Sequence, residues 1–190
     1  TSIGKSAFYG CTSLSFITIP QSVKSIGHSA FCKCTNLTSI VLPSSITAIS
    51  DHLCAGYNEL VSIEIPDSVT SIGCSAFTFC KFASFKIPRS VVSFGGNPFA
   101  GCKDLEVIDI SENPNFVFDH GVLMNKEKTK IISLNSSQAG DYTIPNTVTS
   151  ICKRAYMGCS KLTSITVPNS VKEIRDNAFY RRTFNLNHNS

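Results

Sequence analysis

The sequence predicts a repeat solenoid, in which short coils stack on one another and share one parallel β-sheet. The first observation is a fixed interval between prolines, which are 23, 23 and 22 residues apart and then again 23 apart: Pro20, Pro43, Pro66 and Pro88, followed by Pro145 and Pro168. The second is the alternation of apolar and polar residues before each proline, which is typical of a strand. A unit this small cannot bury its own apolar side chains, so each coil must cover its neighbour.

Length and composition are consistent with one folded unit. The 190 residues are 42% hydrophobic and 16% charged, which excludes a disordered charged tail. The formal net charge of +4 falls short of the basic excess of a nucleic-acid-binding protein, and no run approaches the roughly 18 apolar residues that cross a bilayer. We expect about eight coils from 190 residues at 23 per coil, no nucleic-acid partner and no membrane insertion by this segment.

Each coil is expected to contain a strand that ends at the proline. The strand phrases include residues 16–19, 39–42, 62–65 and 164–167. Equivalent strands run the same way and should pair in parallel about 4.8 Å apart, and the proline ends the ladder because it has no N–H. The Ala-Phe-x-x-Cys stretch further along spaces its apolar residues three or four apart, which indicates a short helical, 3-10 or irregular segment on the convex wall.

Two further columns of the repeat hold aromatic residues and cysteines. The aromatic positions are Phe8, Phe31, Phe77, Phe99, Tyr156 and Phe179, with Cys54 in the third repeat. Three residues later come Cys11, Cys34, Cys80, Cys102 and Cys159, with Tyr57 in the third repeat. Equivalent residues of adjacent coils lie about 4.8 Å apart with parallel Cβ directions, whereas a disulfide needs Cβ atoms about 3.8 Å apart that face each other. We expect buried, reduced thiols in this column, and one incidental disulfide stays open among the others: Cys32, Cys54, Cys74 and Cys152.

The repeat is interrupted between Ile110 and Ile144, where the spacing between strand phrases grows to 34 residues. Strand-like segments at 115–118, 121–124 and 130–134 surround the polar run 125–129, as in a hairpin. The chain thus divides into regular coils at 1–110, a variant repeat with a β-hairpin insertion at 111–144, regular coils at 145–180 and a polar C-terminal tail at 181–190. Because Thr1 enters the pattern part-way through a repeat, we expect a fragment of a longer chain.

The repeated phrase resembles a known family. Ile-Pro-x-Ser-Val-x-Ser-Ile-Gly-x-x-Ala-Phe-x-x-Cys-x-x-Leu-Thr-Ser-Ile is similar to the BspA-like leucine-rich-repeat family over residues 1 to about 180, with the best copies at 20–42, 66–82 and 145–167. The resemblance implies a solenoid of the leucine-rich-repeat type. One position departs from the phrase, because Gly27 is replaced by Ser50, Cys152 and Arg175 in other copies, which indicates that this turn does not require a positive φ.

No motif for catalysis, a cofactor or a metal stands out in the sequence. The nucleophile elbow Gly-x-Ser-x-Gly and the phosphate-binding Gly-x-x-x-x-Gly-Lys loop are both absent. A metal site could start from His28, Cys32 and Cys34, or from Cys74 and Cys80, but paired Cys-x-x-Cys knuckles are missing. We expect a chain without enzymatic activity, catalytic residues, cofactors or a metal site.

The remaining candidate is the outward face of the strands. Residues that alternate with the core should line the sheet surface, and solenoids bind partners on such extended faces. Glu64, Lys86 and Asp109 alternate in sign along the stack, which favours a polar protein or glycan over a polyanion. The predicted binding face comprises Phe16, Val41, Glu64, Lys86, Asp109, Thr143 and Thr166.

Two functions of different kinds fit these observations. The resemblance implies a non-enzymatic binding module of a surface-displayed or secreted adhesion protein, with a protein or glycan ligand on a host or neighbouring cell. The alternative is a structural spacer or intracellular interaction scaffold, in which the stack only sets distance. End-to-end self-association of the stack is kept as a further partner alternative.

Overall fold

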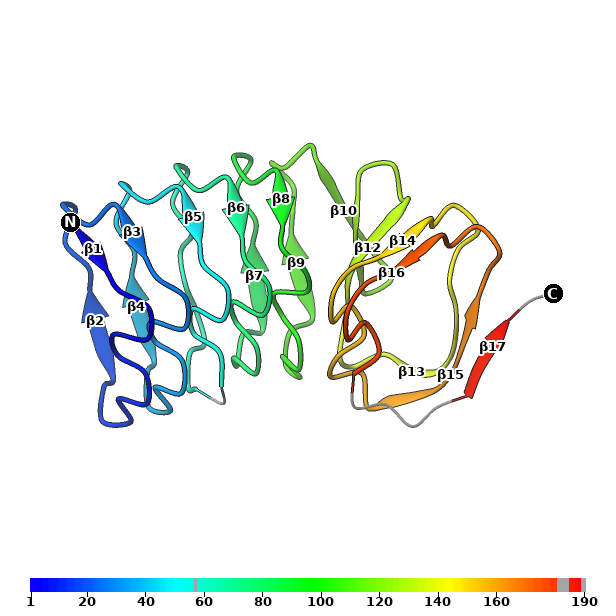
Figure 1. The fold of residues 1–190 in the computed structure, drawn as a ribbon, viewed down its shortest axis with the longest axis horizontal. Helices are drawn as coiled ribbons and strands as arrows, with labels where there is room; N and C mark the ends of the chain where they lie inside the picture. The colour runs from blue at the N-terminus through cyan, green and yellow to red at the C-terminus, as the bar shows by residue number, and fades with distance from the viewer. Residues whose placement is uncertain (57, 181–184, 189–190) are drawn as a thin grey trace.

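The protein is a β-solenoid of about seven coils (Figure 1). This computed structural model describes residues 1–56, 58–180 and 185–188. The number of coils is below the expected eight, in part because the coil around residues 110–144 uses 34 residues from one strand phrase to the next, 11 more than a regular coil of 23. Among the residues described, none belongs to a helix that is long and apolar enough to cross a membrane.

Parallel strand pairing is present as expected, but it is spread over two faces of the coil. The first face carries the strands of the repeated strand phrase, five of which precede a proline while β9 and β17 do not: β2 (Phe16–Thr18), β4 (Ser39–Val41), β7 (Ser84–Lys86), β9 (Val107–Asp109), β13 (Ala139–Thr143), β15 (Lys161–Val167) and β17 (Asn185–His188). The second face carries two-residue strands beyond the proline corner: β1 (Ser2–Ile3), β3 (Ser25–Ile26), β5 (Ala48–Ile49), β6 (Ser71–Ile72), β8 (Ser93–Phe94), β14 (Ser150–Ile151) and β16 (Glu173–Ile174). The register follows the repeat, since Ile17 pairs with Ile40 on the first face and Ile3 with Ile26 on the second.

The third side of the coil, the turn side, is built from tight turns at residues 4–14 and their equivalents. Two columns there adopt a left-handed backbone conformation: Ser6, Ser29, His52, Ser75, Arg154 and Asn177, and then Gly10, Lys33, Gly56, Phe79, Gly101 and Gly158. Backbone hydrogen bonds still join successive coils, as from Phe31 N to Leu53 O at 2.9 Å. The convex wall is therefore irregular, and its backbone groups are satisfied from coil to coil.

Gly27 does not belong to these left-handed columns. Neither Gly27 nor its equivalents Ser50 and Cys152 has a positive φ, as the substitutions at this position indicate. A Cβ on Gly27 would instead lie 2.5 Å from Lys5 N in the preceding coil. Glycine at residue 27 therefore allows two coils to approach closely rather than an unusual turn.

The columns of the repeat fill the core. Phe31, Phe77 and Tyr156 are fully buried. Rings stack from coil to coil, with 5.1 Å between the centroids of Phe8 and Phe31 and 4.9 Å between those of Tyr156 and Phe179. Burying such a side chain stabilises the fold by roughly 1.5–3 kcal/mol. Because each ring contacts the next coil, this stabilisation requires both coils to be folded.

The nine cysteines are all free thiols. Four of the five column cysteines are buried as expected: Cys34, Cys80, Cys102 and Cys159. The expectation is wrong for Cys11, which is exposed because the first coil is covered on one side only. The buried thiols also donate to carbonyls of the preceding coil, as from Cys34 to Phe8 O and from Cys102 to Phe77 O, both at 3.0 Å. Burial raises the pKa of Cys102 to about 12, so the thiol stays protonated and unreactive at neutral pH.

The variant coil carries an antiparallel meander on the second face. β10 (Phe116–Asp119) pairs with β11 (Val122–Asn125), which pairs with β12 (Lys130–Leu134). The pairing of β11 with β12 across residues 126–129 is the hairpin that the sequence indicates at this position. β12 then pairs in parallel with β14, so the meander leads back into the regular ladder.

The variant coil leaves a direct contact between its two neighbours on the turn side. Asn97 N donates to Lys153 O (2.9 Å), so the turn at residues 95–101 stacks on the turn at residues 153–158. A Cβ on Gly158 would lie 2.4 Å from Gly101 N, which shows how closely these turns approach. The meander therefore widens one side of the solenoid and not the other. In Figure 1 the coils of β1 to β9 are seen edge-on, whereas those of β13 to β17 are seen more nearly face-on, so the axis bends at this junction.

The end of the chain continues the first face. Residues 181–184 and 189–190 of the expected polar tail lie outside the described residues, whereas residues 185–188 form β17, which pairs in parallel with β15. Leu186 takes the register of Ile165, so the sequence Asn-Leu-Asn continues the alternation of the strand phrases.

Candidate binding face

The predicted binding residues lie on the first face, in two adjacent columns. Five of them occupy one column of the parallel ladders: Val41, Lys86, Asp109, Thr143 and Thr166. Phe16 lies in the neighbouring column, where it pairs with Ser39. The side chains of Phe16 and Val41 are 55% and 48% exposed, although both are large and apolar. Alternation with the core residues turns both columns toward solvent.

The structure brings only part of this set together. β7 pairs with β9, and β13 pairs with β15, but β9 and β13 belong to different sheets. Thr143 and Thr166 therefore lie beyond the bend, away from Lys86 and Asp109 (Figure 1). The candidate site is consequently the first face between β2 and β9.

Residues 61–65 form an unpaired rung in the middle of this face. They lie between β4 and β7 in the stack but belong to no strand. Within the described residues, no backbone hydrogen bond joins this rung to β4 or β7. Its N–H and C=O groups are therefore free to bind water or a ligand.

Two furrows flank this rung and meet at its acidic side chains. The furrow on the β4 side has a volume of about 430 Å³ and the one on the β7 side about 330 Å³, and Glu64 and Asp67 line both. Both furrows have mixed linings: the first includes apolar Val41 and Leu42 beside polar Gln21 and Ser44, and the second includes Lys86 and Glu112 beside apolar Ile63 and Pro88. The face thus offers apolar and charged surface within reach of one ligand.

Asp67 and Glu112 were not among the residues predicted from the sequence. Both lie at the corner that follows a strand phrase. The equivalent corner positions hold Gln21, Ser44, Asp67 and Arg89, spaced by the repeat. A change of residue type at a repeated position is the same signal that identifies the strand columns, and it would have found this column too.

Charges on the face are held in place by local hydrogen bonds. Lys86 Nζ lies 3.0 Å from Glu112 Oε1, and this hydrogen bond raises the pKa of Lys86. The backbone N–H of Ser111 donates to Asp109 Oδ1 (3.0 Å) and lowers the pKa of that carboxyl. No ion pair of the described residues includes Glu64 or Asp67. These two carboxylates are therefore available to a partner.

The side chains considered for a metal site do not converge. In the described part of the chain, no group of three or more His, Cys, Asp and Glu could hold a metal ion. His28 faces Asp51, with 3.9 Å between Nδ1 and Oδ2, and the Cys34 thiol faces a backbone carbonyl. These residues take part in contacts between coils.

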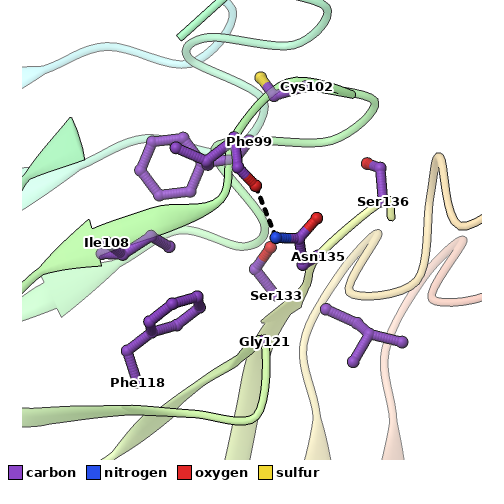
Figure 2. A pocket seen from close by; sticks show the side chains of 10 residues that line it. Phe99, Cys102, Ile108, Phe118, Gly121, Ser133, Asn135 and Ser136 are labelled. Atoms are coloured by element: carbon purple, nitrogen blue, oxygen red, sulfur yellow. Dashed lines mark hydrogen bonds between the residues drawn. The ribbon is translucent and has the colours of Figure 1, made fainter. Parts of the chain in front are cut away.

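A small, partly open cavity lies at the junction, where the meander meets the preceding coils (Figure 2). Phe99 and Ile108 face Phe118 around a volume of about 10 Å³. Asn135 Nδ2 donates to Leu105 O at the same place. Since one water molecule needs roughly this volume, a larger ligand does not fit there, and the furrows of the first face are the better candidates for binding.

Comparison with known proteins identifies the repeat. A family model described as BspA type leucine rich repeat region matches residues 1–124 and 133–189, in 6 copies. No match is found among curated proteins.

Solved structures of bacterial leucine-rich repeat proteins are similar along nearly the whole chain. One from Eubacterium ventriosum ATCC 27560 is 30% identical, with a TM-score of 0.80 over 95% of this chain and 48% of its own. A leucine rich cell surface protein from Faecalibacterium prausnitzii A2-165 is 30% identical, with a TM-score of 0.72 over 100% of this chain and 58% of its own. A third, from Bacteroides ovatus ATCC 8483, is 27% identical, with a TM-score of 0.61 over 94% of this chain and 56% of its own. The chain thus spans about half the length of these structures.

Proposed function

The chain belongs to the BspA type leucine-rich repeat family, and from this premise we propose that it is a non-enzymatic binding module of a surface-displayed or secreted adhesion protein. Its ligand is a protein or glycan on a host or neighbouring cell. The ligand is bound on the first face, around Val41, Glu64, Lys86 and Asp109. The stack supplies a rigid support, and the outward side chains supply recognition.

One observation carries this proposal. Two furrows open side by side on the first face and share Glu64 and Asp67, which have no ion-pair partner among the described residues. The adjoining Val41 is an exposed apolar side chain that contributes little to the core. Protein interfaces combine an apolar centre with a polar, solvent-accessible rim, and Val41 with the nearby carboxylates offers both kinds of surface. Binding on an extended face is also the common use of solenoids.

Surface display is supported by one of the similar structures. The protein from Faecalibacterium prausnitzii A2-165 is described as a leucine rich cell surface protein. It is 30% identical to this chain, which covers 58% of it. We extend this location to the present chain as part of the proposal.

A binding assay with paired variants tests the proposal. The chain is applied to an array of mammalian glycans and extracellular-matrix proteins, and each interaction found is measured by surface plasmon resonance. The double substitution Val41→Asp with Glu64→Lys changes both furrows. We expect it to weaken binding at least about tenfold, because substitutions in the centre of an interface have the largest effects.

A matched control lies on another face. Val92 is 60% exposed and lies next to β8 on the second face, so Val92→Asp repeats the valine-to-aspartate part of the double substitution outside the furrows, and Val41→Asp alone is measured beside it. Equal loss of binding in Val41→Asp and Val92→Asp would refute the assigned face. Failure to bind any component of the array would favour the spacer alternative. Thr143→Lys with Thr166→Lys separately tests whether the coils beyond the bend take part.

A further inference from the structure

Arg154 links distant coils across the junction on the turn side. Its Nη1 atom lies 2.8 Å from His52 Nε2 and 2.7 Å from Ser75 Oγ, although these residues are 102 and 79 positions away in the sequence. His52, Ser75 and Arg154 belong to the same left-handed column of the turn side. The variant coil contributes no residue to this column, so the Arg154 side chain reaches back to the coils that precede it.

The hydrogen-bond chemistry fixes the protonation state of His52. A guanidinium group has only donors and stays charged in proteins. His52 Nε2 must therefore accept, which is possible only when the imidazole is neutral with its proton on Nδ1. A protonated His52 has no acceptor nitrogen and would place a second positive charge against Arg154.

The surroundings of His52 oppose its protonation on balance. Burial acts most strongly and Arg154 next, and together with His28 and Lys153 they lower the pKa of His52 from its ordinary value of 6.5. Asp51 acts in the opposite direction. Its carboxylate is engaged elsewhere, because Asp51 Oδ1 accepts from Cys74 N at 2.8 Å and Oδ2 faces His28.

The contact lies where two turns depend on a few bonds. Asn97 N donates to Lys153 O, and Asn97 Nδ2 donates to the carbonyls of Arg154 and Ala155 at 3.0 and 3.2 Å. Residues 153–155 therefore hold the junction through their backbone while the Arg154 side chain is anchored on His52 and Ser75. The Arg154 side chain is thus a second link, beside the Asn97 bonds, between residues 153–155 and the preceding coils.

We propose that the Arg154–His52 contact is an acid-sensitive latch, which opens the turn-side junction between residues 95–101 and 153–158 when His52 takes up a proton. The direction of the pH effect follows from the linkage between proton binding and opening. The closed form binds the proton more weakly than the open form, so acidification favours opening. The latch contributes fully above about pH 6.5 and is lost as the pH falls through the lower pKa of the closed form. The latch is independent of any ligand on the first face.

Hydrogen exchange in the whole chain tests the latch. The amide of Asn97 reports the junction, and the amide of Phe31, which donates to Leu53 O at 2.9 Å, reports a regular coil. The wild type is compared with His52→Gln, because glutamine keeps an acceptor oxygen and cannot gain a proton. We expect equal protection of Asn97 at pH 7.5. At pH 5 the wild type should exchange several-fold faster than His52→Gln, with Phe31 the same in both.

Two further variants make the result decisive. His120 is 94% exposed in the meander, so His120→Gln removes a histidine without touching the latch. The proposal would be overturned if the wild type and His52→Gln protected the amide of Asn97 equally at pH 5. It would also be overturned if His120→Gln slowed the exchange of Asn97 at pH 5 as much as His52→Gln does. An NMR titration of the His52 ring covers the case in which His52→Gln does not fold. A midpoint below 6.5 that rises in Arg154→Gln supports the latch, and a midpoint at or above 6.5 in the wild type rejects it.

Discussion

The regular coils of residues 1–110 and the variant repeat of residues 111–144 pack against their neighbours in different ways. In the regular coils each residue contacts its own equivalent one repeat away, as Phe8 does Phe31. In the variant coil part of this stacking continues, with 4.8 Å between the ring centroids of Phe94 and Phe116, and buried asparagines add polar contacts. Asn113 Nδ2 donates to Pro88 O and Val91 O at 2.6 and 2.9 Å, and Asn113 is only 6% exposed.

Asparagine suits the junction because one amide both donates and accepts. Asn97 illustrates this, since Nδ2 donates to two carbonyls of the following coil while Oδ1 accepts from Phe99 N at 2.8 Å. Stability in the regular coils is thus spread over repeated apolar contacts. At the junction a few buried polar groups add to apolar contacts such as that of Phe94 with Phe116.

The largest effect should come from removing a ring in the regular coils. Phe77→Ala is expected to lower the free energy of unfolding by about 3–5 kcal/mol, because it leaves a cavity between two coils. Phe77 is fully buried and contacts Phe85 and Phe99, with 5.3 and 6.2 Å between ring centroids. Urea denaturation measures the change, and Phe16→Ala at an exposed position is the control. A urea midpoint of Phe77→Ala equal to that of the wild type would contradict the assignment of the aromatic column to the core.

A smaller effect is expected at the junction. Asn97→Ala should cost about 2–3 kcal/mol, because it leaves buried backbone groups without partners. If the junction depends on such groups, the urea transition of this variant should also broaden or divide, as the coils on each side unfold separately. Asn36→Ala, at an exposed asparagine of a regular coil, is the control. Loss of less than about 0.5 kcal/mol with an unchanged transition would show that the two regions are held in the same way.

The smallest effect on stability is expected on the first face. Lys86→Glu together with Asp109→Lys should change the free energy of unfolding by no more than about 0.5 kcal/mol, because both side chains lie outside the core. Thermal melting checks this expectation. A larger loss would mean that the pair of Lys86 with Glu112 supports the fold, and the face would then be less free to vary than we propose.

Periodicity explains how much of the fold the sequence predicts. Ile3, Phe31 and Leu37 are predictable because each recurs in register with residues of the same kind. The left-handed columns are not, because Lys33 and Phe79 stand among the glycines and hide the signal. Asn97 has no periodic signature, and its partners lie 57 and 58 residues away.

The candidate site is predictable to a similar degree. Alternation places Val41, Lys86 and Asp109 on one outward column. In the structure these residues take equivalent positions in the parallel ladders, where Thr18 pairs with Val41 and Lys86 with Asp109. It does not reveal the corner residues of the furrows, because they fall outside the strand phrases. It also does not separate Thr143 and Thr166 from the rest, since the break between β9 and β13 follows from the three-dimensional path of the meander.

The one-sided thickness of the variant coil has a geometric consequence. Strands β10, β11 and β12 act as a wedge, because they add material along one flank while Gly101 and Gly158 stay in close approach along another. The size of such a wedge sets the direction in which the solenoid axis continues after the junction, whereas the stacks on either side carry the outward surfaces. The residues that set the direction of the solenoid axis are thus different from the residues that line its outward face. A longer or shorter meander would change the angle between the two stacks of coils without changing a side chain on the surface of either stack.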